Sequence, residues 1–161
     1  MTYICAMMSP EKKEARYRRI YNQISALMKE PNDLIARMAT LVAVLHHKFD
    51  YYFWTGFYIY KDEQLIVGPY QGPLACQILA RNKGVCWAAF NQAKPIIVKD
   101  VHQFPDHIAC DSRSNSELVV PLINSKSEII AVLDIDSQSF AAFDEIDAKM
   151  LQEILSLIFK L

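Results

Sequence analysis

Residues 107–123 have the sequence HIACDSRSNSELVVPLI, and the two halves of this stretch differ in character. The first eleven positions are mostly polar and hold a histidine, a cysteine, an arginine and two acidic residues. The last six, 118–123, form an apolar run with β-branched residues, which predicts a buried strand. Loops held by core strands often carry reactive side chains. We therefore expect this strand to lie in the core and the loop before it to carry chemistry.

Cys110 is the reactive candidate in this loop. Unpaired cysteine often behaves as a small buried apolar side chain, and that inert role is the alternative interpretation. The neighbours of Cys110 are polar, and reactive thiols occur in such partly exposed, polar surroundings. The composition of the loop therefore favours a chemical role for Cys110.

Helical patterns occur near both ends of the chain. Apolar residues recur at helical spacing over 10–29, after a possible N-cap at Ser9, and again over 34–48. A third such pattern follows Asp144, a suitable N-cap with further acidic residues in the first turn. We expect one helix from each of these patterns.

The middle of the chain is rich in strand patterns. Two hairpins are predicted, one from 53–60 and 64–67 and one from 117–123 and 128–133, because polar turns separate the members of each pair. A short helix over 85–92 and a short strand over 96–98 lie between the hairpins. The segment 74–79 fits either a strand or an extended loop. The sequence thus predicts the α+β class, with a central antiparallel sheet sandwiched by N- and C-terminal helices.

The bulk composition excludes several classes of protein. The 161 residues suit one domain, 1–161, with residues 1–8 as a flexible end. The 17 basic and 18 acidic residues create no overall field for nucleic acid or for a membrane surface. No apolar run has the length of a spanning helix, and the N-terminus has no secretion pattern, so we expect a cytoplasmic protein with a small, neutral partner.

Three of the four cysteines, Cys76, Cys86 and Cys110, fall in the central region, and Cys5 lies outside it. A structural zinc site usually has Cys-x-x-Cys pairs, whereas 9 and 23 residues separate these three. A redox relay needs only one nucleophilic thiolate and one or two thiols that can reach it. The spacing therefore favours a redox role over metal binding.

Three acidic residues are predicted to meet at one face of the sheet. Asp134 and Asp136 flank Ile135 at the end of an apolar strand, and Glu117 could approach them from the neighbouring strand. Clustering would raise the pKa of at least one carboxyl group. The alternative, which the residues alone do not exclude, is a solvated strand end.

Trp54 and Tyr58 share one face of the strand 53–60 because their spacing is even. Plain core packing is the simpler interpretation of these two aromatic residues, and a wall of a binding site is the other.

Four short motifs together carry a resemblance to a known family. They are GPLAC at 72–76, GVC at 84–86, HIACD at 107–111 and LDIDS at 133–137. With them the chain, from about Trp54 to the C-terminal helix, resembles the free methionine-R-sulfoxide reductases, which are stand-alone enzymes with the GAF fold. The resemblance implies a GAF-like fold and thiol-dependent reduction of free methionine (R)-sulfoxide.

The resemblance also implies roles for individual residues. Cys110 would attack the sulfoxide sulfur and become a sulfenic acid, and a disulfide with Cys76 or Cys86 would then form, with Cys76 favoured. Thioredoxin would reduce this disulfide, without a metal or an organic cofactor. The remaining site residues would bind substrate: the aromatic residues Trp54 and Tyr58, and the acidic residues Glu117, Asp134 and Asp136.

Two positions depart from the family pattern. Trp87 stands where a small residue is usual, which puts the relay role of Cys86 in doubt, and Asp106 replaces a glycine. The family also suggests a homodimer formed through the terminal helices. A different class of function, a sensory GAF module that binds a small ligand without converting it, is the alternative to the enzyme.

Overall fold

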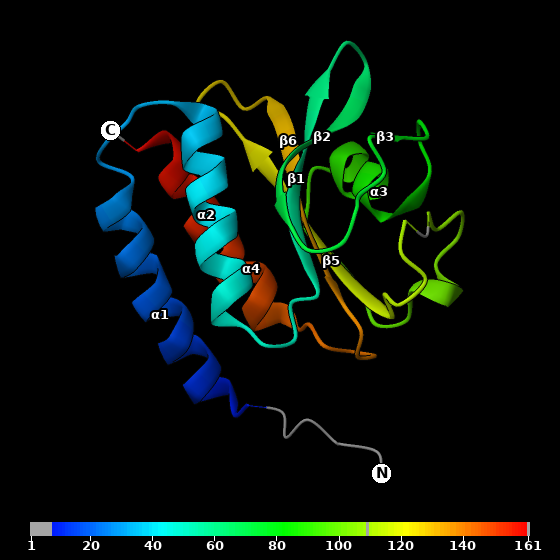
Figure 1. Ribbon diagram of the computed structural model, residues 1–161, viewed down its shortest axis with the longest axis horizontal. Coiled ribbons are helices and arrows are strands. Elements are labelled where there is room, and N and C mark those ends of the chain that lie inside the picture. Colours follow the sequence, from blue (N-terminus) through cyan, green and yellow to red (C-terminus); the bar gives the residue numbers. More distant parts are fainter. Residues whose placement is uncertain (1–7, 109, 161) are drawn as a thin grey trace.

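The computed structural model describes residues 8–108 and 110–160, and its centre is a six-stranded antiparallel sheet with the order β3-β2-β1-β6-β5-β4 (Figure 1). The strands are β1 (Trp54–Lys61), β2 (Gln64–Gln71), β3 (Ile78–Leu79), β4 (Ile96–Val98), β5 (Ser116–Ile123) and β6 (Ile129–Ser137). Of the predicted flexible segment 1–8, only Met8 is among the described residues, and Cys5 lies outside them.

Four α-helices and two short 3-10 helices accompany the sheet. They are α1 (Pro10–Leu27), α2 (Leu34–Lys48), α3 (Gly84–Gln92), η1 (Val101–Gln103), α4 (Glu145–Leu155) and η2 (Ser156–Phe159). The predicted caps are confirmed, since Ser9 caps α1 and Asp144 forms a reciprocal capping box with Asp147 at the start of α4. In the described part of the chain, no helix combines the length and the apolar character needed to cross a membrane.

The helices cover the two faces of the sheet unequally. Helices α1, α2 and α4 lie together on one face, and α3 lies on the other (Figure 1). The α+β class is therefore confirmed, with the N- and C-terminal helices side by side on one face rather than on opposite faces. The three helices pack together because each buries a long apolar stripe in the same core.

Side chains along the central strands point alternately to the two faces of the sheet. One face packs against α1, α2 and α4, and the other faces α3. In β6, Leu133 and Ile135 enter the main core, whereas Val132 and Asp134 point to the α3 side. In β5, Leu118 is in the main core and its neighbours along the strand face α3. The period-2 pattern of the sequence thus decides which side chains can reach a site on that face.

Two strands are longer than predicted. β6 continues through the acidic residues to Ser137 because it is paired on both sides, with β1 and with β5. β2 continues past Val67 to Gln71, although Pro69 lacks a backbone N–H. The register with β1 shifts between Gly56 and Tyr58, and an irregularity of this kind tolerates a proline.

Candidate active site

A cavity of about 40 Å³ lies on the α3 side of the sheet, between the sheet and the loops that follow β2 and β4. All but one of the predicted site residues line this cavity: Trp54, Tyr58, Cys86, Cys110, Glu117, Asp134 and Asp136. The exception is Cys76, which is covalently attached to one of them. The fold therefore brings together residues that are up to 82 positions apart in the sequence, from Trp54 to Asp136.

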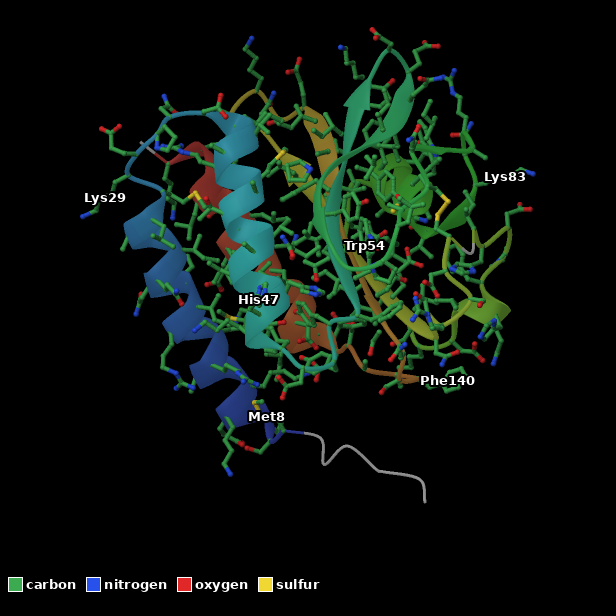
Figure 2. The ribbon with its side chains drawn as sticks, in the orientation of Figure 1. Met8, Lys29, His47, Trp54, Lys83 and Phe140 are labelled. Atoms are coloured by element: carbon green, nitrogen blue, oxygen red, sulfur yellow. A yellow bond between two sulfur atoms is a disulfide. The ribbon has the colours of Figure 1, made fainter. Side chains whose placement is uncertain are left out.

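A disulfide joins Cys76 to Cys110 across 34 positions of sequence, with their Cα atoms 5.5 Å apart. Figure 2 shows this bond in yellow on the same side of the sheet as α3. Cys110 is exposed and Cys76 is half-buried, so the bond lies where a reactant from solvent can approach it. The loop after β2 and the loop before β5 are thereby tied together beside the cavity.

The three carboxyl groups meet because of the strand register. Glu117 pairs with Asp136 across β5 and β6, and Asp134 lies two residues along on the same face. Glu117 and Asp134 are 5% and 7% exposed, so the alternative of a solvated strand end is wrong for these two residues. Asp136 is half-buried. The predicted cluster of acids is thus a feature of the folded chain.

Burial dominates the acid–base properties of this cluster. Desolvation and the charge of Asp136 raise the pKa of Glu117 well above its usual range. The pKa of Asp134 is raised well above its usual range by desolvation and by the charge of Glu117. The pKa of Asp136 is raised in the same way by desolvation and by the charge of Asp134. A carboxyl group with a raised pKa can keep its proton near neutral pH and donate it to an oxygen atom of a ligand.

Cys86 lies at the start of α3, next to these acids. This residue is 4% exposed, and its thiol is not part of a disulfide. Desolvation and the charge of Asp134 raise the pKa of this thiol well above its usual range. A thiol in this environment stays protonated, which makes it a weak nucleophile.

The aromatic wall is connected to the segment that carries Cys76. Trp54 and Tyr58 stack with ring centroids 5.8 Å apart and an interplanar angle of 22°. The indole Nε1 of Trp54 donates a hydrogen bond to the carbonyl oxygen of Pro73 (3.1 Å), and the hydroxyl of Tyr58 donates to that of Cys76 (3.1 Å). The two residues form one side of the cavity, in addition to their packing role.

His107 also lines the cavity, although no role of its own was predicted for it from the sequence. Its Nε2 atom lies 3.5 Å from Oε2 of Glu117, and desolvation lowers the pKa of the imidazole. The imidazole is therefore neutral near pH 7 and can donate to or accept from a neighbouring polar group. Its position three residues before Cys110 is the only sequence signal for it.

The two departures from the family pattern have different outcomes. Trp87 is buried against Phe90, with ring centroids 5.4 Å apart, and it is not among the residues that line the cavity. Cys86 does line the cavity, so the larger neighbour has not turned it away. Asp106 has φ = 53°, a left-handed conformation that aspartate tolerates better than most residues.

The assembled groups suit a two-electron reduction. Two cysteines in bonding distance can supply two electrons, and buried carboxyl groups can supply protons. The stacked rings offer an apolar surface for a small ligand.

Comparison with known proteins identifies the family of the chain. The model of the GAF domain family matches residues 33–158. GAF domain-containing protein A of Dictyostelium discoideum is 44% identical over 152 residues, covering 94% of this chain and 95% of that protein. The free methionine-R-sulfoxide reductase of Escherichia coli is 38% identical over 140 residues, covering 87% and 84%.

A solved structure gives the same answer. The X-ray structure of the free methionine-R-sulfoxide reductase from Neisseria meningitidis, in complex with its substrate, is 40% identical and superposes with a TM-score of 0.87, covering 94% of this chain and 90% of that one. Both reductases match this chain over most of its length, one in sequence and the other in sequence and fold. The chain therefore belongs to the free methionine-R-sulfoxide reductases, a family of enzymes built on the GAF domain.

Proposed function

We propose that this protein reduces the R epimer of free methionine sulfoxide to methionine, with Cys110 as the nucleophile and Cys76 as the thiol that closes the disulfide. The observation that carries the proposal is the Cys76–Cys110 disulfide beside a cavity that also holds three carboxyl groups and an aromatic wall. The names of the E. coli and N. meningitidis relatives support the substrate.

In the first step the thiolate of Cys110 attacks the sulfur of the sulfoxide. The sulfoxide oxygen passes to the cysteine sulfur, so methionine leaves and Cys110 becomes a sulfenic acid. The sulfoxide is reduced by two electrons, and the cysteine is oxidised by two. A sulfoxide sulfur is a weak electrophile until its oxygen accepts a proton. Glu117, with Asp134 and Asp136, supplies that proton or shares it through a hydrogen bond.

In the second step the thiol of Cys76 attacks the sulfur of the sulfenic acid. The new S–S bond replaces the S–O bond, and the hydroxyl group leaves as water with the proton of Cys76. The structure corresponds to the state after this step. Its disulfide ties the loop after β2 to the loop before β5 beside the cavity, so substrate enters after the disulfide has been reduced.

The arrangement suits one epimer because the sulfoxide sulfur has three different substituents besides its lone pair. The acids hold the oxygen, and Trp54 and Tyr58 hold the methyl group. The direction of attack from Cys110 is then fixed. The mirror-image sulfur would place either its oxygen against the rings or its methyl group against the acids, and both placements are unfavourable.

Cys86 is the alternative resolving thiol. Its burial and its protonated state make it a slow partner, so we assign the direct role to Cys76. In a Cys76→Ser variant, the sulfenic acid is expected either to persist or to form a slower disulfide between Cys86 and Cys110. Peptide mapping by mass spectrometry separates these two outcomes.

Thioredoxin is the proposed reductant, because Cys110 is exposed and a protein dithiol can approach it. A cytoplasmic setting fits this cycle, since thiols are kept reduced there. Two copies could pair through the outer surfaces of α1 and α2, where Leu27 and Ile35 are 46% and 49% exposed.

The test is methionine release from separated R and S epimers of free methionine sulfoxide, with dithiothreitol or thioredoxin as reductant. Wild type should convert the R epimer, and Cys110→Ser should not. Cys86→Ser is the matched control, since it removes a cysteine from the same cavity and should retain turnover with dithiothreitol. Failure of folded, reduced wild type to convert either epimer would refute the enzyme and favour a ligand-binding sensory module.

A further inference from the structure

We propose that Cys86, Glu117 and Asp134 form a binding site for a divalent metal ion of the zinc type. Sγ of Cys86 and one carboxylate oxygen from each of the two acids lie within 4.8 Å of one another, and all three residues are buried. This set shares its acids with the sulfoxide site but uses a cysteine that the proposed reaction does not need.

The ligand types and the distances fit zinc. Zinc binds thiolate sulfur at about 2.3 Å and carboxylate oxygen at about 2.0–2.2 Å, so tetrahedral ligand atoms are about 3.4–3.6 Å apart. Atoms that lie within 4.8 Å of one another need to approach by at most about 1.2–1.4 Å, which side-chain rotations provide. Calcium and magnesium prefer oxygen ligands alone, so the thiolate selects for zinc and similar ions.

An unpartnered atom in the cluster also points to a ligand. Oδ1 of Asp134 is buried and has no hydrogen-bond partner among the described residues, and the residue is 7% exposed. Leaving a buried polar atom unsatisfied is costly, and such an atom in a folded protein calls for an explanation. A metal ion bound among the three residues would satisfy it.

The scaffold holds the three ligands on separate, well-packed elements. Cys86 is in the first turn of α3, and Glu117 and Asp134 are on the adjacent strands β5 and β6. Because all three residues line the cavity, an ion can enter from it, and a fourth ligand can come from the same side. His107, whose Nε2 lies 3.5 Å from Oε2 of Glu117, or a water molecule would fill that position.

A bound ion would have a functional consequence, which rests on the proposed function. It would occupy the acids that hold the sulfoxide oxygen, so zinc would act as a reversible inhibitor of the reductase. Binding itself does not depend on that function, and the two can be measured separately.

The test uses oxidised protein with the Cys76–Cys110 disulfide closed, in a Cys5→Ser background, so that Cys86 is the single remaining thiol of the four cysteines. Co²⁺ serves as a spectroscopic probe, because a cobalt–thiolate bond gives a charge-transfer absorption, and Zn²⁺ is titrated by calorimetry. Both are done at about pH 8, since thiols and carboxyl groups bind metals in their deprotonated form.

We expect one ion per chain, a cobalt–thiolate absorption, and loss of both in Cys86→Ser and in Asp134→Asn. Asp136→Asn is the matched control, because Asp136 is an acid of the same cavity outside the ligand set, and it should retain the ion. Absence of binding in the parent protein, or binding that persists in Cys86→Ser or Asp134→Asn, would overturn the proposal. Inhibition of methionine release by Zn²⁺ that is reversed by chelator and lost in Cys86→Ser would then support the consequence for the enzyme.

Discussion

Replacing Asp147 by alanine should destabilise the protein strongly, although this residue has no role in the cavity. Asp147 is fully buried on the helical face of the sheet. Its Oδ2 accepts hydrogen bonds from Nζ of Lys13 (2.7 Å) and from the backbone N–H of Asp144 (2.8 Å). Its Oδ1 accepts from the hydroxyls of Tyr17 (2.6 Å) and Tyr51 (3.2 Å). One carboxylate thus joins α1, α4 and the segment before β1.

The size of the effect follows from what the variant leaves behind. Lys13 is 6% exposed and would keep only Asp144, at 2.8 Å. Breaking a buried ion pair by removing one partner costs about 3–5 kcal/mol. The hydroxyl of Tyr51 and the N–H of Asp144 would also lose their acceptor, whereas Tyr17 would keep Tyr52 at 2.7 Å. We expect the free energy of unfolding to fall by about 4 kcal/mol, which lowers Tm by roughly 8–16 °C in a chain of this length.

The assay is urea unfolding of the disulfide-closed proteins, followed by circular dichroism and analysed by linear extrapolation. Asp144→Asn is the matched control, because its side chain is 44% exposed and asparagine is an equally good N-cap. It should cost less than about 1 kcal/mol. Reductase turnover of folded Asp147→Ala, measured well below its Tm, should match wild type, since the cluster lies on the opposite face from the cavity.

Equal destabilisation by Asp147→Ala and Asp144→Asn would refute this reasoning, because burial would then not be the deciding factor. A loss below about 1.5 kcal/mol for Asp147→Ala would do the same, since it would mean that the buried lysine needs no second partner.

Three further predictions concern the cavity. Glu117→Gln should reduce kcat/KM for the R epimer by about 10²–10⁴-fold through loss of the acid, and wild-type rates would contradict that role. In reduced protein, iodoacetamide should modify Cys86 more slowly than Cys110, and it should need a higher pH to do so, because burial raises the pKa of the Cys86 thiol. Equal rates for the two cysteines, measured by mass spectrometry, would contradict this. Gly56→Ala would place a Cβ atom against Cβ of Tyr70 and 2.5 Å from the indole of Trp54. If the indole shifts, KM should rise and tryptophan fluorescence should change; a changed fluorescence with an unchanged KM would contradict a substrate contact of this ring.

The local elements were largely predictable because their signals are local. The N-caps at Ser9 and Asp144 and the even spacing of Trp54 and Tyr58 depend on neighbouring residues only, and the structure contains both the caps and the shared face. The positions of strand ends were less predictable. β6 runs through Asp134 to Ser137 because strands on both sides supply hydrogen bonds, and no feature of its own sequence reports those neighbours.

Most of the residues proposed for the site were predictable as members of the cavity, and the geometry of the cavity was not. Cysteine and acid motifs in the sequence identified the residues that meet there, partly through family resemblance. Sequence gave no means of knowing that Glu117 pairs with Asp136 in register, or that His107 lies 3.5 Å from Glu117. These contacts depend on how two loops and three strands pack in space, and long-range packing leaves no periodic trace in the chain.

The disulfide also makes the stability of the fold depend on the redox state of the cell. A cross-link that closes a loop of 34 residues stabilises a protein by up to about 4 kcal/mol in the chain-entropy model, a large part of the stability of a typical domain. In the proposed cycle, the protein would alternate between a more stable disulfide form and a less stable reduced form that is ready for substrate. The melting temperature would then report directly what fraction of the enzyme is in the reduced form.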